Sequence, residues 1–195
     1  MTRKVLKRFI RKNPVAGVLL CLVLVVALLF LQSTPSINTD NNVSSQRCYA
    51  ELIRVIDGDT LLVSIDGKNI KVRLIGIDTP ESVHSDESKN NEYGDMASAY
   101  TSALLQDISD VWLEYDQEEY DRYGRILAYV WLSSESADDT YQDMLNYELI
   151  HDGYAYNKEY APNTKYADVF EAARIECEAE GRGLWVYEEF AELWQ

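Results

Sequence analysis

Six charged side chains stand at positions where a strand or a turn is expected to end, and their types suit one kind of chemistry. In chain order they are Asp57, Asp59, Arg73, Asp78, Glu81 and Arg125. Carboxylate and carbonyl oxygens are the ligands that calcium prefers, and a carboxylate not used as a ligand can accept a proton from an attacking water. Arginine offers paired planar donors to a phosphate whose charge rises in the transition state. Together these residue types predict metal-assisted hydrolysis of a phosphodiester.

Each of these residues also has a simpler interpretation. The sequence Asp57-Gly58-Asp59 is typical of a tight turn, Arg73 fits a strand residue that faces solvent, and Arg125 fits a salt-bridge partner in a loop. Other chemistries are disfavoured by what the chain lacks. It has only two histidines, His84 and His151, which argues against a multi-histidine zinc site. No glycine-rich Gly-Lys-Ser/Thr pattern is present to form a phosphate-binding loop.

Three strands in succession are expected to position the acids. Apolar-rich segments predict strands at residues 49–56, 60–65 and 70–77, and a glycine-containing two-residue turn predicts a hairpin between the second and the third. In such a meander the end of the third strand returns beside the start of the second. Asp59 and Asp78 can therefore converge.

The rest of the chain alternates between strand and helix patterns. Two further strands are predicted at residues 111–115 and 126–132. Apolar residues at helical spacing predict helices at residues 96–104, 141–149 and 164–180, the last beginning at a capping threonine. The predicted fold class is α+β, a five-stranded OB-fold β-barrel with three packed α-helices.

An N-terminal segment of different composition precedes this domain. Residues 1–13 are basic and residues 14–31 are almost wholly apolar, the pattern of a transmembrane signal anchor or of a signal peptide with the basic side in the cytoplasm. The exit from the apolar run lacks a small-x-small cleavage pattern, which favours the anchor. Residues 32–47 fit a flexible linker, and residues 48–195 fit the globular domain. We therefore expect a single-pass membrane protein with an extracytoplasmic domain, or a secreted protein if the leader is cleaved.

The acidic balance of the chain limits how it can bind nucleic acid. There are 18 basic and 33 acidic residues. Six of the basic residues and none of the acidic ones lie in the first 31 positions, so the remainder carries a formal charge of −21. This negative charge opposes tight binding of nucleic acid through counterion release. Nucleic-acid chemistry must then depend on a few well-placed cations and a metal ion.

Two cysteines, Cys48 and Cys177, bracket the globular domain. In an oxidising compartment they could form a disulfide that ties the first strand to the last helix. The alternative is two separate buried thiols. The sequence leaves both open.

Three ordered motifs resemble those of staphylococcal nuclease-like domains. They are VIDGDT at residues 55–60, VRLIGIDTPE at residues 72–81 and DRYGRILAYV at residues 121–130, and the resemblance extends over residues 48–187. It implies a nuclease that cuts DNA and RNA without sequence specificity at the 5′ P–O bond and leaves 3′-phosphates. The expected cofactor is Ca²⁺, and no obligate protein partner is expected.

The same resemblance implies a role for each motif residue. Asp59, Asp78 and the backbone carbonyl of Thr79 would bind Ca²⁺, and Asp57 would support that site without contacting the ion. Glu81 would act as the general base. The phosphate-binding residues would be Arg73 and Arg125 for the phosphate that is cut, and Arg122 and Tyr123 for its neighbour.

Some segments depart from the family pattern. Residues 83–92 carry acids where the best-known member is lysine-rich, and residues 153–162 are one residue shorter. Tyr156 and Tyr160 are both candidates for a tyrosine that faces the substrate. Two other interpretations remain: a catalytically inactive OB-fold module that binds nucleic acid or protein, and a surface protein that uses the barrel for protein or glycan contacts.

Overall fold

The computed structural model of the chain describes residues 47–82, 91–134 and 141–194. The predicted basic segment, the apolar segment and all but the last residue of the linker, residues 1–46, lie outside these ranges, as does His84. Across the described ranges we find no helix with the length and apolar character needed to cross a bilayer.

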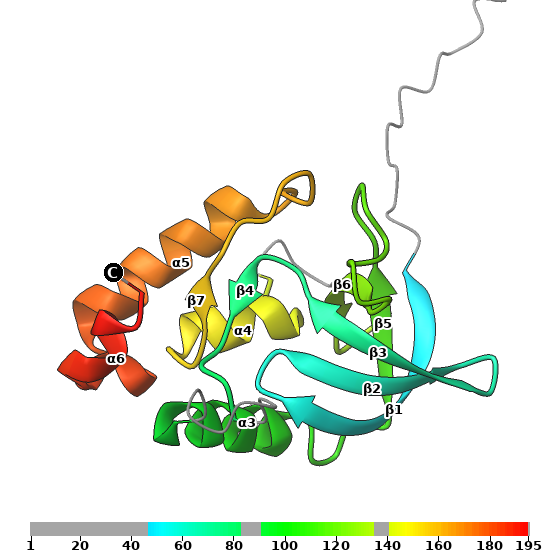
Figure 1. The fold of residues 1–195 in the computed structure, drawn as a ribbon, viewed down its shortest axis with the longest axis horizontal. Helices are drawn as coiled ribbons and strands as arrows, with labels where there is room; N and C mark the ends of the chain where they lie inside the picture. The colour runs from blue at the N-terminus through cyan, green and yellow to red at the C-terminus, as the bar shows by residue number, and fades with distance from the viewer. Residues whose placement is uncertain (1–46, 83–90, 135–140, 195) are drawn as a thin grey trace, which may run out of the picture. The chain divides into compact units, whose positions relative to one another are not determined.

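Five strands form a closed barrel in the order β1-β2-β3-β6-β5. They are β1 (Cys48–Asp57), β2 (Thr60–Ile65), β3 (Lys68–Leu74), β5 (Asp110–Glu114) and β6 (Ile126–Trp131). β3 and β6 run parallel, and the other neighbouring pairs are antiparallel. The predicted α+β, OB-like barrel with helices around it is confirmed (Figure 1).

The barrel interior explains why these segments become strands. Side chains of the barrel strands that are fully or almost fully buried include Ala50, Leu61, Val63, Val72, Leu74, Val111, Leu113, Ala128 and Val130. On β2 and β3 these positions alternate with residues that are less buried, which is the two-residue period of a strand with one face on a core. Closure of the barrel removes the exposed edges that an open sheet of this kind would leave.

The third predicted strand is wrong at its end. Instead of continuing to residue 77, β3 stops at Leu74, and the chain turns at Gly76, whose φ is +76°. A short strand β4 (Ile77–Asp78) then pairs antiparallel with β7 (Tyr156–Asn157). Asp78 therefore leaves the barrel and lies on a separate two-stranded ribbon. Glycine suits this turn because other residues adopt a positive φ only with strain.

The described residues also hold four α-helices and a 3₁₀ helix. They are α3 (Glu92–Leu104), α4 (Leu145–His151), α5 (Ala167–Glu180), the 3₁₀ helix η2 (Gly183–Val186) and α6 (Glu188–Glu192). Figure 1 shows α4, α5 and α6 gathered beside the β4–β7 ribbon, and α3 lying next to the β1–β2 end of the barrel. The sequence predicted α3, α4 and α5, but it did not predict η2 and α6.

The predicted starts of all three helices are wrong, and the first helix, α3, begins at Glu92 rather than at Met96. The second helix begins at Leu145 rather than at Tyr141, because Met144 forms an isolated β-bridge with Trp131 and Tyr141 has a φ of +56°. The third helix begins at Ala167, and its N-cap, Tyr166, makes no side-chain capping bond. The threonine predicted as its cap therefore lies before the helix.

The disulfide alternative for Cys48 and Cys177 is wrong, because both cysteines are free thiols. Cys48 is half-buried on β1. Cys177 is fully buried on α5, where its sulfur lies 4.0 Å from the Arg182 carbonyl, and a Cβ on Gly153 would come within 3.0 Å of it. Burial is the main cause that raises the pKa of the Cys177 thiol to about 11. A thiol in this environment is unreactive.

Gly76→Ala tests the turn that separates β3 from β4. A Cβ at this position would lie 2.7 Å from the Phe170 ring, and the backbone has a positive φ. Overpacking and backbone strain together should lower the free energy of unfolding by about 2–4 kcal/mol in urea titrations. Gly67→Ala is the matched control, since its φ is +75° but nothing lies within 4 Å, and it should cost only about 1 kcal/mol. Equal losses in the two variants would contradict the packing argument.

Candidate active site at the barrel rim

The turn between β1 and β2 is held from two sides. Asp57 Oδ1 accepts hydrogen bonds from the Gly58 amide at 2.8 Å and from the Ser82 hydroxyl at 2.6 Å. The Thr101 hydroxyl on α3 donates to the Gly58 carbonyl at 2.8 Å. A Cβ on Gly58 would lie 2.7 Å from Thr79 Oγ1, so glycine permits the close approach of the segment after β4. Asp57 thus ties this turn to the segment that follows Asp78.

Arg73 joins Asp59 and Asp78. Its Nη2 lies 2.9 Å from Asp59 Oδ2 and 2.7 Å from Asp78 Oδ1. Its Nη1 donates to two carbonyls, those of Leu74 at 2.8 Å and Ile77 at 2.9 Å. The three charged side chains are only 10–19% exposed, so little water screens the contacts between them. The convergence of Asp59 and Asp78 expected from the sequence is therefore confirmed.

The oxygen atoms around this pair fit a hard cation. Asp59 and Asp78, hereafter the carboxylate pair, both contact one nitrogen and so face a common point. Asp59 Oδ2 also accepts the Thr79 amide at 3.2 Å, and Asp59 Oδ1 accepts the Thr60 hydroxyl at 2.9 Å. Among the described residues no three His, Cys, Asp or Glu side chains form a group that could hold an ion. A cation here would be held by two carboxylates and a backbone carbonyl, a donor set that suits calcium.

Lys158 contacts the carboxylate pair and was missed by the sequence analysis. Its Nζ lies 2.6 Å from Asp78 Oδ2, the oxygen that Arg73 does not contact. Partial burial acts to lower the pKa of the Lys158 ammonium, but the contacts with Asp78 and Tyr160 outweigh it and the pKa is raised. The ammonium is therefore charged. No sequence signal pointed to Lys158, because its position depends on the pairing of β4 with β7.

Arg125 is positioned by Asp121, a second residue whose role was missed. Asp121 Oδ1 accepts the amides of Tyr123 at 2.8 Å and Arg125 at 2.9 Å, and Asp121 Oδ2 accepts Arg125 Nε at 2.6 Å. Burial acts to raise the pKa of the Asp121 carboxyl, but these hydrogen bonds and the guanidinium charge lower it below its ordinary value. Aspartate followed by a glycine three residues later is typical of such a turn, so this role could have been predicted.

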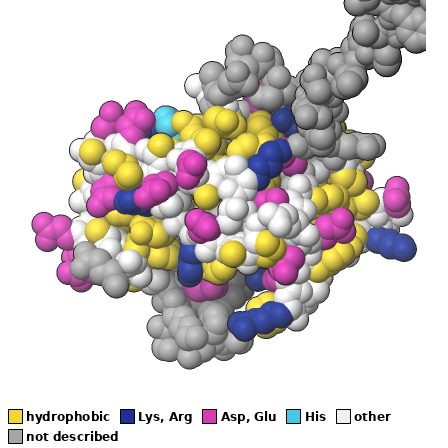
Figure 2. Space-filling model, turned by 90° about the horizontal axis from the view of Figure 1, so that it is seen from above, with side chains coloured by type: hydrophobic (Ala, Val, Ile, Leu, Met, Phe, Trp, Pro, Cys, Tyr) yellow, Lys and Arg dark blue, Asp and Glu magenta, His cyan; other side chains and the backbone are white. Residues whose placement is uncertain are grey.

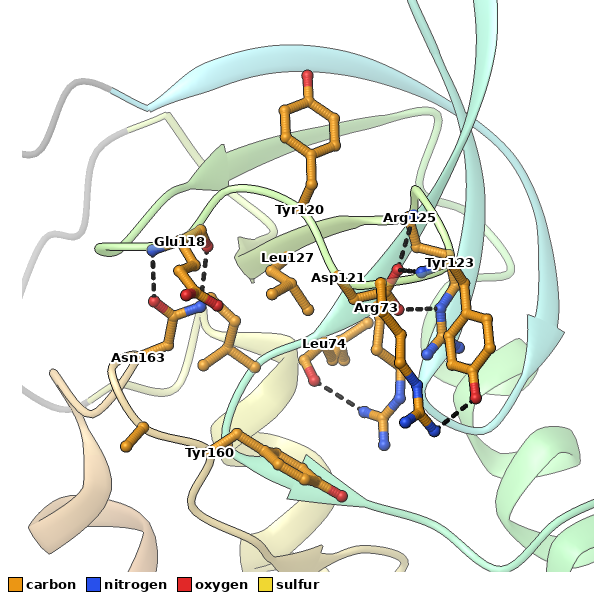
Figure 3. Close-up of a pocket in the computed structure, with 14 residues that line it drawn as sticks. Arg73, Leu74, Glu118, Tyr120, Asp121, Tyr123, Arg125, Leu127, Tyr160 and Asn163 are labelled. Carbon is orange, nitrogen blue, oxygen red and sulfur yellow. Dashed lines mark hydrogen bonds and ion pairs between the residues drawn. The ribbon is translucent and has the colours of Figure 1, made fainter.

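A cavity of about 480 Å³, hereafter the rim cavity, lies beside these residues. Its wall includes Arg73, Arg125, Arg122, Tyr123, Glu118, Tyr160 and Asn163. Figure 3 shows Tyr123 and Arg125 on one side of it, Glu118 and Asn163 on the other, and Tyr160 below. The predicted phosphate-binding arginines, Arg73 and Arg125, therefore share one cavity.

Arg122 and Tyr123 form a contacting pair at this wall. Arg122 Nη2 donates to the Tyr123 hydroxyl at 2.6 Å, and its guanidinium carbon lies 4.7 Å from the centre of the Tyr123 ring. Of the two candidate tyrosines, Tyr160 lines the rim cavity. Tyr156 instead stacks on Trp194, with ring centres 4.9 Å apart.

Glu81 lies near the carboxylate pair but not in the wall of the rim cavity. Its backbone carbonyl accepts the Asn91 amide at 3.1 Å, at the start of α3. A Cβ on Gly94 would lie 2.3 Å from the same carbonyl, so the close approach requires a glycine in the first turn of that helix. Glu81 is exposed to solvent. Of the residues to which the family resemblance assigns roles, Asp59, Arg73 and Asp78 are thus in contact, and Arg125 shares the cavity with Arg73. Glu81 follows Asp78 by three residues.

The face of the molecule that Figure 2 shows is not broadly basic. On the face shown in Figure 2, acidic side chains are interspersed with basic and hydrophobic ones. The arginines and the lysine described above are therefore local positive charges on an acidic protein. A small closed barrel with paired carboxylates and an arginine-lined cavity at its rim belongs to the OB-like class, and the cavity suits an anionic ligand.

Comparison with known proteins identifies the family. Residues 71–187 match the family described as Staphylococcal nuclease homologue. The chain is 38% identical over 164 residues to the thermonuclease of Staphylococcus hyicus, which covers 84% of this chain and 90% of that protein. Against the thermonuclease of Staphylococcus intermedius it is 38% identical over 175 residues, covering 89% and 98%. Endonuclease YncB of Bacillus subtilis (strain 168) is 36% identical over 135 residues, covering 69% and 60%.

The chain therefore belongs to the staphylococcal nuclease homologue family, as its motifs indicated. This membership and the endonuclease relatives support a nuclease hydrolase.

Asp121→Asn tests how the loop before β6 is held. Because the pKa of Asp121 is lower in the folded chain than in the unfolded one, its carboxylate stabilises the fold above about pH 4, and this contribution is lost as the pH falls through the folded-state pKa. The variant should be about 1 kcal/mol less stable than the wild type at pH 6 in urea titrations. The difference should shrink steadily below pH ~4.

The exposed Asp107→Asn is a suitable control because it removes the same charge outside this loop. It should leave the stability at pH 6 nearly unchanged. A difference between Asp121→Asn and the wild type that persists undiminished at pH ~2 would show that the carboxylate charge is not what holds the loop.

Proposed function

We propose that this chain is a calcium-dependent, non-sequence-specific nuclease that hydrolyses DNA and RNA at the 5′ P–O bond and leaves 3′-phosphates. One observation carries the proposal: a partly buried arginine contacts two converging carboxylates at the edge of a cavity that a second arginine also lines. Cation-binding oxygens and phosphate-binding donors therefore lie side by side. Membership of a nuclease family supports the same conclusion.

The carboxylate pair and the Thr79 carbonyl would hold Ca²⁺, which when bound supplies a Lewis acid next to the phosphate. Arg73 must then exchange partners, since Nη2 now contacts both carboxylates and Nη1 contacts two carbonyls. Once the carboxylates turn to the cation, Arg73 can donate to a phosphate oxygen.

Arg125 needs no such exchange. Asp121 holds its Nε, and within the part of the chain that the structure describes no hydrogen bond engages its two terminal nitrogens. A guanidinium that is fixed at Nε and keeps both terminal nitrogens as donors is preorganised for a phosphate whose charge grows during the reaction. Arg125 would thus stabilise the transition state and assist the leaving oxygen.

Glu81 would accept the proton of the attacking water. Its exposure allows a water molecule to reach the carboxylate, and the hydrogen bond between its carbonyl and Asn91 fixes the backbone from which the side chain extends. Arg122 and Tyr123 would bind the neighbouring phosphate. Asp57 would hold the turn that carries Asp59 against the segment that follows Asp78, through its hydrogen bond with Ser82. Contacts with phosphates and stacking on tyrosine carry no sequence information, which supports cleavage at any sequence.

The cellular location remains a proposal from the sequence pattern. The basic and apolar N-terminal segments favour a domain held outside the cytoplasmic membrane through residues 14–31, or released if the leader is cleaved. Such a location would give the site access to extracellular calcium.

The proposal is tested by cleavage of labelled DNA with purified full-length chain. Activity should require calcium and stop when a chelator is added. Arg125→Ala and Arg73→Ala should each lower kcat on the order of 10²–10³-fold, because each removes a preorganised donor to the transition state. Glu81→Gln should lower kcat while calcium binding measured by calorimetry is retained.

Arg54→Ala is the matched control for the loss of a positive charge, because Arg54 is exposed on β1 and lies outside the rim cavity. It should keep its activity. Chelator-resistant cleavage, or full activity in both Arg73→Ala and Arg125→Ala, would refute the proposed mechanism. A chain that binds an oligonucleotide but never cleaves it would instead be the inactive binding module.

A further inference from the structure

Asp78 is paired with two cations, whereas Asp59 has one. Arg73 contacts Asp78 Oδ1 at 2.7 Å and Lys158 contacts Asp78 Oδ2 at 2.6 Å. Among the residues that the structure describes, Asp59 forms an ion pair with Arg73 alone. The carboxylate pair thus carries two negative charges opposed by two positive ones before any divalent cation is bound. Both oxygens of the more exposed carboxylate are already engaged.

The backbone places Lys158 at this position. Ile77 pairs with Asn157 and Asp78 pairs with Tyr156 in the β4–β7 ribbon. The Lys158 amide then donates to the Gly76 carbonyl at 2.9 Å, one residue further along the same ladder. The main chain on both sides of the ion pair is therefore held by hydrogen bonds. Only the lysine side chain has to be ordered, so the contact costs less entropy than one between two free loops.

Arg73 and Lys158 differ in what they can do when a divalent cation arrives. Arg73 lines the rim cavity, where a phosphate can take the place of the carboxylates. Lys158 stands outside that lining, with its Nζ 5.5 Å from the centre of the Tyr160 ring. Its main electrostatic partner is the carboxylate that the cation would use. A divalent cation must either displace the ammonium from Asp78 or bind close to a like charge, and both reduce its affinity.

We propose that Lys158 is an internal competitor for the divalent cation, and that it sets the calcium affinity of the site by occupying Asp78 Oδ2. This inference rests on the proposed function, because it assumes that the carboxylate pair binds calcium. It makes Lys158 an affinity-determining residue that contacts the metal-binding carboxylate rather than the phosphate or the attacking water. A site with this competitor needs a higher calcium concentration to be half-filled than the same carboxylates would need without it.

Calorimetric titration of the full-length chain with CaCl₂, without substrate, tests the proposal. Lys158→Met removes the charge and keeps most of the side-chain length, so calcium should bind about three- to tenfold more tightly, a modest gain because Lys158 is 44% exposed. Lys158→Arg keeps the charge and should bind calcium within about twofold of the wild type. Equal or weaker calcium binding by Lys158→Met would overturn the inference.

Controls separate this result from general electrostatics and from misfolding. Lys71→Met removes the same charge from the exposed face of β3 and should leave the calcium affinity unchanged. A gain equal to that of Lys158→Met would mean that net charge alone sets the affinity. Lys158→Gln provides a second neutral variant if Lys158→Met loses the circular dichroism spectrum of the wild type.

Asp59→Asn distinguishes failure of the inference from failure of the proposed function. If the wild type binds calcium, Asp59→Asn does not, and Lys158→Met equals the wild type, only the role of Lys158 is wrong. If the wild type shows no calcium binding, or Asp59→Asn binds as well as the wild type, the carboxylate pair is not the calcium site and both proposals fail.

Discussion

The contact of Arg73 with Asp59 and Asp78 is the interaction on which the rest of the site depends. Asp59 comes from the turn between β1 and β2, Asp78 comes from the ribbon outside the barrel, and Arg73 is the next-to-last residue of β3. Neither acid could stay 10–19% exposed without a counter-charge, because burying an unpaired carboxylate is costly. One partly buried guanidinium therefore stabilises the fold at this rim and brings together the oxygens that a cation would use.

The barrel topology explains why the second arginine lies at the same rim. Parallel pairing of β3 with β6 places Arg73 opposite Leu127. Arg125 precedes Leu127 by two residues, so the turn that Asp121 holds stands directly beside Arg73. The rim cavity thus results from the pairing of β3 with β6. Several of the residues that line it come from the turn that Asp121 holds.

The sequence predicted the parts of this protein that depend on local patterns. Alternating apolar residues gave the five barrel strands, and the ordered motifs gave the family and the residues of the carboxylate pair. What it missed depends on distant partners. The ribbon strands β4 and β7 have two residues each, too few to show a period, and Lys158 meets Asp78 across 80 positions of sequence. The choice between Tyr156 and Tyr160 likewise depended on Trp194, which stacks on the first.

The acidic composition is consistent with a site in which carboxylates hold the arginines that line the cavity. A chain with a net charge of −15 repels a polyanion at long range, so the counterion release that drives most nucleic-acid binding can contribute little. Affinity must then come from short-range contacts, in which donors held by carboxylates meet phosphate oxygens inside a cavity. Asp121 fixes Arg125, and the carboxylate pair holds Arg73, which a bound cation would release under the proposed mechanism. Because the same carboxylates bind the arginine and the proposed calcium, cation binding and release of a phosphate-binding donor become one coupled event. In the proposed mechanism this coupling would make the contribution of Arg73 to phosphate affinity depend on the metal, whereas Arg125 would contribute without it.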